Sequence, residues 1–518
     1  MASLTVRIAF LSGEEHGITV PLHATTHELR ATAEMKMQRS LGKLISGGGS
    51  VLQASRTLLQ EGIQDGDIIT AVFQDVKVAA TRLAFAAIRS DGTVVAWGNR
   101  HSGGDCSAVQ EQLQHVQSIQ AAWGAFAALR TDGSVVTWGD PGGGGDSSSV
   151  QSQLCNVCQV QSNLLAFAAI KADGSVVTWG LPSWGGDCSA VRDQLYSVRQ
   201  IQSNGAAFAA LRADGSVVTW GREASGGDSY DVRDELQEGV LNIYSHDGFA
   251  AIKAGGRIVF WGRSVFGAVN APHGLVHSGL DDVAHLQVFG GWWAAASQDG
   301  HLALSFRSIH GDRCLQIPEC AESLARCSDC LAVLQKDGTV QFWGRCAPTW
   351  LRKELSNVVR FRTSGRCDAA IRSDGSVVLW ENTARGSNPG ASALVRSQLT
   401  DVKDIQANMF AFAALRRDGS VVTWGDGRCG GNSAAVQTHL KDVVSIQASN
   451  TAFAAIRRDG SVVSWGEPES GGDSSLVQEQ LGRRVANNKQ AALRAKKAGP
   501  RAVKSQVLKK PSKKYSKK

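Results

Sequence analysis

Along most of the chain, apolar residues alternate with polar ones or form short runs, at the spacing of β-strands. Residues 116–121 (Val-Gln-Ser-Ile-Gln-Ala) have this spacing, and an Ala-Phe-Ala-Ala-Leu-Arg run follows at 125–130. Asp132-Gly133 is then a strong hairpin signal, because Gly accepts a positive φ without steric cost. The next run, 134–139, is rich in β-branched and aromatic residues. The pattern therefore predicts three antiparallel strands.

A Gly-rich connector follows each such group of strands. At 103–113 it begins Gly-Gly-Asp and continues as a short polar-apolar run, in which Asp or Ser can cap one or two helical turns. The whole unit of strands and connector recurs along the chain. About ten units lie between residues 75 and 481, and the first four intervals between their Trp residues are each 41 residues. Ser305 stands in the Trp position of one unit, and the other nine units carry Trp97, Trp138, Trp179, Trp220, Trp261, Trp343, Trp380, Trp424 and Trp465.

One unit cannot fold alone. Ordering each residue costs on the order of 1–2 kcal/mol. One buried Trp removes roughly 200 Å² from water, which stabilises the fold by only about 5 kcal/mol. Each unit has an apolar face that only a neighbouring unit can cover, and radial stacking of such units produces a β-propeller.

The Leu-x-x-Asp-Gly-x-Val-x-x-Trp-Gly signature, followed by a Gly-rich loop, resembles the regulator of chromosome condensation repeat. Its short period is closer to the compact blades of β-lactamase-inhibitor protein II. The resemblance covers about 400 residues and implies a propeller. Those propellers typically have seven blades, whereas this chain has about ten units and no obvious extra strand to close a ring. One enlarged ring, seven blades plus three, and an open superhelix all remain open.

Residues 1–74 have a different pattern of two strands, a helix from Thr26 to about residue 41 and short strands up to Phe73. We expect Thr26 to cap this helix, with Glu28 in its first turn. This order is that of a β-grasp fold. The segment resembles ubiquitin, which has closely similar residues at the places of Leu11-Ser12-Gly13, Lys43-Leu44-Ile45, Arg56-Thr57-Leu58 and Ile63-Gln64. The resemblance implies a partner-binding patch at Leu11, Ile45 and Val72; the alternative is that these are ordinary core or surface residues. The chain continues past Phe73 without a Gly-Gly pair, so we expect a domain that is recognised and not conjugated.

Charge divides the chain into an acidic body and a basic end. Of the 54 Lys and Arg residues, 14 lie in 482–518, which leaves 40 against 47 Asp and Glu in the remainder. We expect this tail to be disordered alone and to act as a nuclear-import signal or to bind nucleic acid nonspecifically; a solubility role is the alternative. Its lysine pairs are Lys496, Lys497, Lys509, Lys510, Lys513 and Lys514.

The compartment and cofactors are predicted from what the sequence lacks. Residues 1–10 read as a strand and not as a secretory signal, and no run approaches the roughly 18–20 apolar residues of a membrane span. Eleven cysteines, an odd number, favour a reducing compartment. We therefore predict an intracellular protein, nuclear or cytoplasmic, with no membrane partner and no cofactor.

Candidate metal and catalytic residues are few. Cys327-x-x-Cys330, near Cys314 and Cys320, has the spacing of half a zinc site, but the repeat alignment puts Cys327 in the Ile slot of a first strand and Cys330 in the first Ala slot of a second. Small buried thiols account for both, so we predict no metal. The repeating Asp of the Gly-Gly-Asp loops favours a helix cap or turn over calcium. We single out no catalytic residue.

The sequence therefore predicts a mainly β, non-enzymatic scaffold for protein partners, with a β-grasp domain at 1–74, a propeller-type array at 75–481 and a basic tail at 482–518. Ubiquitin-pathway or proteasomal proteins are candidate partners. The first alternative is a guanine-nucleotide exchange factor or chromatin-binding protein of the chromosome-condensation type. The second is a relative or subunit of HERC-type ubiquitin ligases that lacks the HECT domain; inhibition of an enzyme by the blade face is a third. The units between 283 and 388 depart most from the repeat. This divergence indicates either a binding face or sequence drift.

Overall fold

The fold was analysed in a computed structural model of the whole chain. It describes residues 3–10, 14–37, 41–53, 56–73, 76–245, 248–262, 274–277, 283, 285–289, 292–297, 301–308, 311–317, 321–327, 330–335, 337–344, 354–363, 367–381 and 395–482. Among these residues, no helix combines the length and the hydropathy that crossing a bilayer requires.

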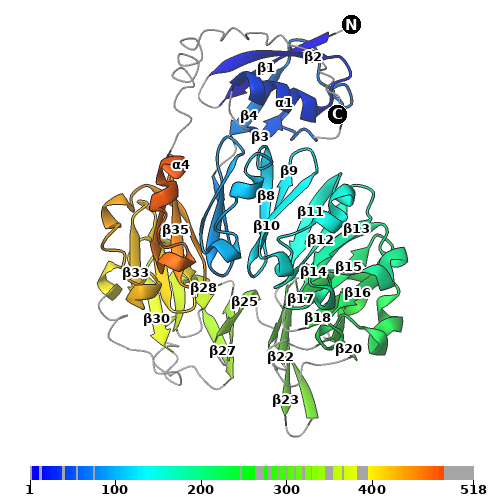
Figure 1. Cartoon of the computed structure of the whole chain (residues 1–518). Coiled ribbons are helices and arrows are strands. Elements are labelled where there is room, and N and C mark those ends of the chain that lie inside the picture. Colours follow the sequence, from blue (N-terminus) through cyan, green and yellow to red (C-terminus); the bar gives the residue numbers. More distant parts are fainter. Residues whose placement is uncertain are drawn as a thin grey trace, which may run out of the picture.

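The N-terminal segment is a four-stranded mixed sheet with one helix (Figure 1). The sheet order is β2-β1-β4-β3, with β1 and β4 parallel and the other pairs antiparallel. Its elements match the order predicted for a β-grasp fold, while the likeness to ubiquitin stays a prediction. The bounds are β1 (Ser3–Phe10), β2 (Glu15–Pro21), α1 (Thr26–Met37), β3 (Leu41–Ile45) and β4 (Ile68–Phe73).

The helix α1 begins at Thr26 as predicted and ends at Met37, before the predicted residue 41, and its capping residue differs from the prediction. Thr25, not Thr26, forms the cap: its Oγ1 accepts the backbone N–H of Glu28 at 3.2 Å, and the Glu28 carboxylate accepts the Thr25 backbone N–H at 2.7 Å. This reciprocal pair is a capping box. The backbone N–H of Thr25 also lowers the pKa of Glu28. Thr26 is buried instead.

Ten further sheets, here called blades 1 to 10, follow in chain order. Eight have three strands and two have four, so the predicted three-stranded unit is extended in blades 5 and 6. Blades 1 to 5 comprise β5 (Lys77–Ala80), β6 (Ala84–Ile88), β7 (Val94–Gly98); β8 (Val116–Ala121), β9 (Ala125–Arg130), β10 (Val135–Gly139); β11 (Val157–Ser162), β12 (Ala166–Lys171), β13 (Val176–Gly180); β14 (Val198–Ser203), β15 (Ala207–Arg212), β16 (Val217–Gly221); and β17 (Val240–Ser245), β18 (Phe249–Lys253), β19 (Arg257–Trp261), β20 (Gly274–His277).

Blades 6 to 10 complete the series, and the short helix α4 (Gln478–Gly482) lies beyond the last strand. Short 3-10 helices such as Ser107–Val109 and Ser148–Gln153 form the connectors. The strands are β21 (His285–Phe289), β22 (Trp292–Ala296), β23 (Leu302–Ser308), β24 (Gly311–Ile317); β25 (Ala321–Cys327), β26 (Cys330–Gln335), β27 (Val340–Gly344); β28 (Val358–Thr363), β29 (Cys367–Arg372), β30 (Val377–Glu381); β31 (Val402–Ala407), β32 (Ala411–Arg416), β33 (Val421–Gly425); and β34 (Val443–Ala448), β35 (Ala452–Arg457), β36 (Val462–Gly466).

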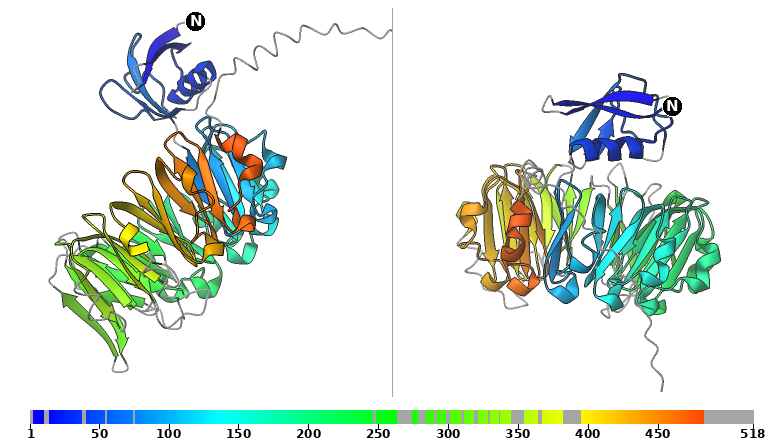
Figure 2. Two further views of the ribbon diagram at one scale, coloured as in Figure 1. Left: turned by 90° about the vertical axis from the view of Figure 1, so that its left-hand side faces the viewer. Right: turned by 45° about the horizontal axis from the view of Figure 1, so that its top comes forward.

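The blades form one closed ring (Figures 1 and 2). The first strands of most successive blades contact each other, including β21 with β25 where the sequence is most divergent, and they form the inner wall. Blades 5 and 6 meet in a buried cluster that includes Phe260 and Leu286. Blade 10 packs against blade 1, since Phe85 and Val95 share one buried cluster with Ala454, Ile456 and Leu481. The ring therefore closes through an ordinary interface between blades, and the seven-plus-three and open arrangements are excluded.

The predicted Trp residues hold neighbouring blades together. Phe126 of β9 stacks on Trp138 of β10 with ring centroids 5.1 Å apart, and both side chains are buried. The Trp138 indole Nε1–H donates to the Gly103 carbonyl of the preceding blade at 3.0 Å. Gly103 has a φ of +88°, and a Cβ there would lie 2.6 Å from the Phe126 ring, so only Gly fits. The same Trp-to-Gly bond joins Trp97 to Gly471 across the closure, also at 3.0 Å.

Blades 6 to 8 depart from this arrangement. In blade 6, Trp293 pairs with Ser305, so the aromatic residue lies on the second strand and not on the third. In blade 8, buried Asp368 stands opposite Trp380, and Trp380 meets Phe361 of the first strand edge-on instead.

The register corrects one cysteine assignment. Leu324 pairs with Val333 as Ile119 pairs with Ala128, so Leu324 holds the Ile slot. Cys327 pairs with Cys330 one position past the end of the corresponding strand. Placing Cys327 in the Ile slot was therefore wrong.

Candidate binding site

A belt of backbone hydrogen bonds joins the loops between the first and second strands of neighbouring blades. In each step, a loop N–H donates to the carbonyl of the equivalent residue in the next blade. The successive bonds run from Met409 to Asn450 (3.4 Å), to Arg82 (3.0 Å), to Trp123 (2.9 Å), to Leu164 (2.9 Å) and to Gly205 (3.3 Å). The belt therefore spans blades 9, 10, 1, 2, 3 and 4 without interruption and fixes these six loops relative to one another.

These six residues form a surface that we call the central rim. It surrounds a depression of about 760 Å³ at the end of the first strands. Small side chains at the strand ends widen the depression, among them Ala80, Ala121, Ser162 and Ser203. The rim lies at the opposite end of the strands from the Asp-Gly hairpins, because each first strand ends in a rim loop and each second strand ends in a hairpin.

Two large apolar side chains of the rim are exposed. Trp123 is 39% exposed and Met409 is 52% exposed, although most Trp residues of the repeat are buried. The Arg82 guanidinium lies over the Trp123 ring, 4.9 Å from its centroid, and this cation–π contact restrains both side chains. The rim thus presents an aromatic, a cationic and a thioether group on a rigid backbone.

A polar side chain directly before five of the six rim residues explains that rigidity; the exception is Ala122, before Trp123. Asn204 is buried; its amide donates to the Ser225 carbonyl at 2.6 Å, and its side-chain oxygen accepts the N–H of Ala207 at 3.0 Å. Asn163 and Asn408 do the same, and Thr81 and Ser449 bond with their hydroxyls. This position is Thr, Asn or Ser in five of the six loops, whereas Arg, Trp, Leu, Gly, Met and Asn occur at the next one.

The Asp of the Gly-Gly-Asp loops is structural, as predicted. Asp146 accepts the backbone N–H of Ser148 at 2.9 Å, two residues along, where the connector helix begins. This bond lowers the pKa of the Asp146 carboxyl group. Among the described residues, no group of three or more His, Cys, Asp or Glu is placed to hold a metal ion. The same N–H bond is made by Asp105, Asp187, Asp228 and Asp473.

The structure describes only part of the predicted β-grasp patch. Leu11 lies outside the described residues, and only the backbone of Val72 is described. Ile45 is partly exposed and pairs with Thr70, while Lys43 pairs with Val72, so positions 45 and 72 are on the same face of the β3–β4 pair. The register brings these two positions together, and binding by the patch stays a prediction.

Other predicted residues fall in different places. The tail lysines Lys496, Lys497, Lys509, Lys510, Lys513 and Lys514, like the rest of 483–518, lie outside the described residues. Trp343 is in β27, but its side chain is not described. The remaining repeat Trp residues are buried and serve the blade interfaces.

The sequence pattern alone did not predict the central rim. Its signal was available as a short variable segment between two nearly constant strands: Thr-Arg-Leu at 81–83, Ala-Trp-Gly at 122–124 and Asn-Met-Phe at 408–410. Only the ring places these segments side by side.

Comparison with known proteins finds no matching family model and no matching curated protein. Among solved structures, Prp20p of Saccharomyces cerevisiae is 13% identical, with 82% of this chain and 96% of that chain covered at a TM-score of 0.33. Yeast RCC1 (Prp20) bound to Kap60 is 16% identical, with 53% and 71% covered at 0.28. The CRINKLY WD40 ectodomain of the Arabidopsis thaliana receptor kinase ACR4 is 14% identical, with 50% and 93% covered at 0.30. The chain is a mainly β array of repeated antiparallel sheets closed into a ring, and this description rests on its own contacts.

Proposed function

We propose that the chain is a non-enzymatic scaffold that binds a protein partner at the central rim. The observation that carries this proposal is the pair formed by Trp123 and Arg82, exposed on the same hydrogen-bonded belt of backbone as Met409. Trp and Arg are the residue types most often responsible for protein–protein affinity.

Rigidity supports the same conclusion. A partner that docks on the rim need not order the loops, because the belt and the Asn side chains already hold them. Binding to an ordered surface avoids part of the entropic cost of association. The rim also supplies apolar area, a cation and amide groups, which suit contact with a protein surface.

The β-grasp patch extends the proposal to a second partner. Ile45 on β3 is partly exposed, and positions 45 and 72 share a face. A ubiquitin-pathway or proteasomal protein would bind there, so the chain would join two partners. No residue of the rim points to the exchange-factor or ligase-related alternatives, which remain predictions from the repeat alone.

The test is quantitative capture from cell extract with the full chain and two variants. Trp123→Ala removes the rim aromatic residue, and Leu476→Ala removes an equally apolar side chain that is 98% exposed on a connector. We expect Trp123→Ala to lose a defined set of partners that Leu476→Ala retains. If both variants capture the same proteins as the unmodified chain, the rim is not the binding surface.

A further inference from the structure

The inner wall of the ring exposes more side chains than a regular strand would. In eight first strands the register shifts between the first and third residues, for example between Val116 and Ser118 in β8. Such a β-bulge inserts an extra residue and leaves it unpaired. Aliphatic residues at the bulged position are exposed, namely Leu241 (59%), Val359 (55%) and Val444 (40%). Because the first strands form the inner wall, this position faces the channel.

Charge on this wall is opposite to that of the body. The ten first strands contain six basic residues and only two acidic ones, Glu322 and Asp404. The body as a whole, residues 1–481, has 40 basic and 47 acidic residues. The basic residues of the wall are Lys77, Arg199, Arg326, Arg360, Arg362 and Lys403.

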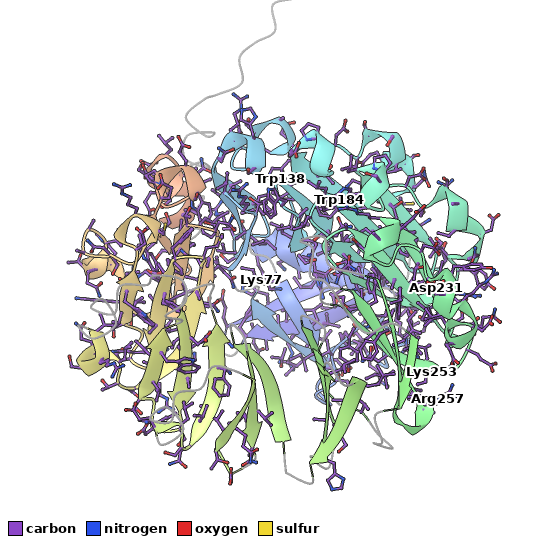
Figure 3. All side chains as sticks on the ribbon, turned by 90° about the horizontal axis from the view of Figure 1, so that it is seen from below. Lys77, Trp138, Trp184, Asp231, Lys253 and Arg257 are labelled. Carbon is purple, nitrogen blue, oxygen red and sulfur yellow. The ribbon has the colours of Figure 1, made fainter. Side chains whose placement is uncertain are left out.

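Most of these cations lie on one arc of the wall, from blade 8 through blade 10 to blade 1. Arg360 and Arg362 share a single carboxylate, Asp404, at 3.2 and 3.1 Å. Lys403 beside it is exposed, and so is Lys77, which lies on the inner side of the ring (Figure 3). Among the described residues, neither lysine has a carboxylate within ion-pair distance. By contrast, Arg130 and Arg212, which lie beside the hairpins, are each paired with a local Asp.

A notch opens in the wall at Lys77. Strand β5 has four residues and no bulge, whereas its neighbours β8 and β34 have six. The shorter strand leaves a hollow of about 340 Å³ between blades 10, 1 and 2. Apolar groups line it around Lys77, namely Val76, Val78, Ile119 and Ile456.

We propose that this arc, Arg360, Arg362, Lys403 and Lys77 with the adjoining notch, binds an acidic segment of a protein partner and seats one of its apolar side chains. Arg360 and Arg362 share one carboxylate, and Lys77 and Lys403 have none within ion-pair distance among the described residues, so the arc has an excess of positive charge that favours carboxylates. The notch adds an apolar contact. The segment does not come from this chain's own tail, which is basic. A long nucleic acid is disfavoured because the acidic body around the channel repels it. The proposal rests on the proposed function only in that the partner is a protein.

The test uses a fluorescent peptide of alternating Glu and Leu residues, titrated with the full chain and followed by anisotropy. The variant Lys77→Glu, Arg360→Glu, Lys403→Glu reverses the arc. The control Arg100→Glu, Arg192→Glu, Arg233→Glu makes the same charge change at exposed positions on the connectors. The basic tail is common to all proteins, so its contribution cancels in the comparison. We expect the arc variant to weaken binding at least about tenfold more than the control.

A second measurement locates the peptide. Carbodiimide couples carboxylates to nearby amines, so mass spectrometry should find the peptide on Lys77 and Lys403 in preference to Lys441, which is exposed but not on a first strand. If circular dichroism shows that the arc variant does not fold, the milder double variant Lys77→Gln, Lys403→Gln replaces it, with a smaller loss of peptide affinity expected.

Equal peptide binding by the arc and control variants overturns the proposal. So does tighter, arc-dependent binding of an oligothymidine of equal charge, which would identify nucleic acid as the ligand. Trp123→Ala should leave peptide binding unchanged, so failure of the rim and failure of the channel are told apart.

Discussion

The regular blades and the divergent blades of the ring pack the same strand positions in different ways. In blades 1 to 4, 9 and 10, a Phe on the second strand stacks on the Trp of the third, with centroids between 5.0 and 5.4 Å apart. In blade 8, Asp368 replaces that Phe, and the Trp380 and Phe361 rings are nearly perpendicular with centroids 6.3 Å apart. In blade 6, Ser305 replaces the Trp itself.

The difference shows which part of the repeat is required for ring closure. First strands still contact each other from blade 6 to blade 9, and blades 5 and 6 share a buried cluster, so the ring is continuous without the aromatic stack. The stack and its Trp-to-Gly bond instead fix how closely each connector lies against the next blade. In blades that lack this bond, the side chains of the second and third strands can vary without opening the ring. Three predictions on stability test the role of the stack, the bond and the connector.

The largest effect is expected for Phe126→Ala. Phe126 is fully buried between its own Trp138 and Gly103 of the preceding blade, so truncation should cost about 3–5 kcal/mol of unfolding free energy. Phe361→Ala in blade 8 should cost about 1 kcal/mol less, because that ring is less buried and packs edge-on. Chemical denaturation of both variants measures the gap, and equal losses would mean that the stacked arrangement adds nothing.

A smaller difference in stability is expected between the variants Trp138→Phe and Trp424→Phe. The Trp138 Nε1–H bonds the Gly103 carbonyl, whereas within the described part of the chain the Trp424 Nε1–H has no acceptor. Losing the bond should cost about 1 kcal/mol, while removing an unsatisfied buried N–H should be close to neutral. Melting temperatures of the two variants give the comparison. A larger loss at Trp424 would contradict the proposed role of the bond.

The smallest effect concerns the connector carboxylates of the regular blades. Backbone N–H groups lower the pKa of Asp105, Asp146, Asp187 and Asp473 below the unfolded value, so their stabilisation is present above about pH 4 and is lost as pH falls through the lowered pKa values. Changing all four to Asn should lower the melting temperature slightly at pH 7, and the gap should close below pH 4. These groups are largely exposed, so each contributes no more than a few tenths of a kcal/mol. A gap that widens on acidification would contradict the sign.

Most of the blade architecture followed from the sequence because each unit repeats the same local rules. Asp-Gly hairpins, β-branched third strands and the position of Trp138 all reappear in the structure. The number of blades in the ring did not follow, since it depends on the buried cluster that Phe85 of blade 1 shares with Ala454 of blade 10, which no local pattern encodes. The central rim was missed for a related reason: Arg82 and Trp123 are 41 residues apart and meet only when neighbouring blades pack. The cap at Thr25 was misplaced by one residue because two adjacent threonines offer the same hydroxyl.

The closure between blades 10 and 1 also sets the order in which the molecule can assemble. Trp97 and its partner Gly471 are 374 residues apart, so this interface forms only after the last blade has left the ribosome. Until then, the apolar face of blade 1 stays exposed to solvent, whereas each later blade can pack on the preceding blade as soon as it is synthesised. A nascent chain paused near its end would therefore expose two complementary apolar faces, one at each end of an incomplete ring. Joining those faces between two such chains would produce an intermolecular version of the same interface, so the last step of synthesis is the one most open to misassembly.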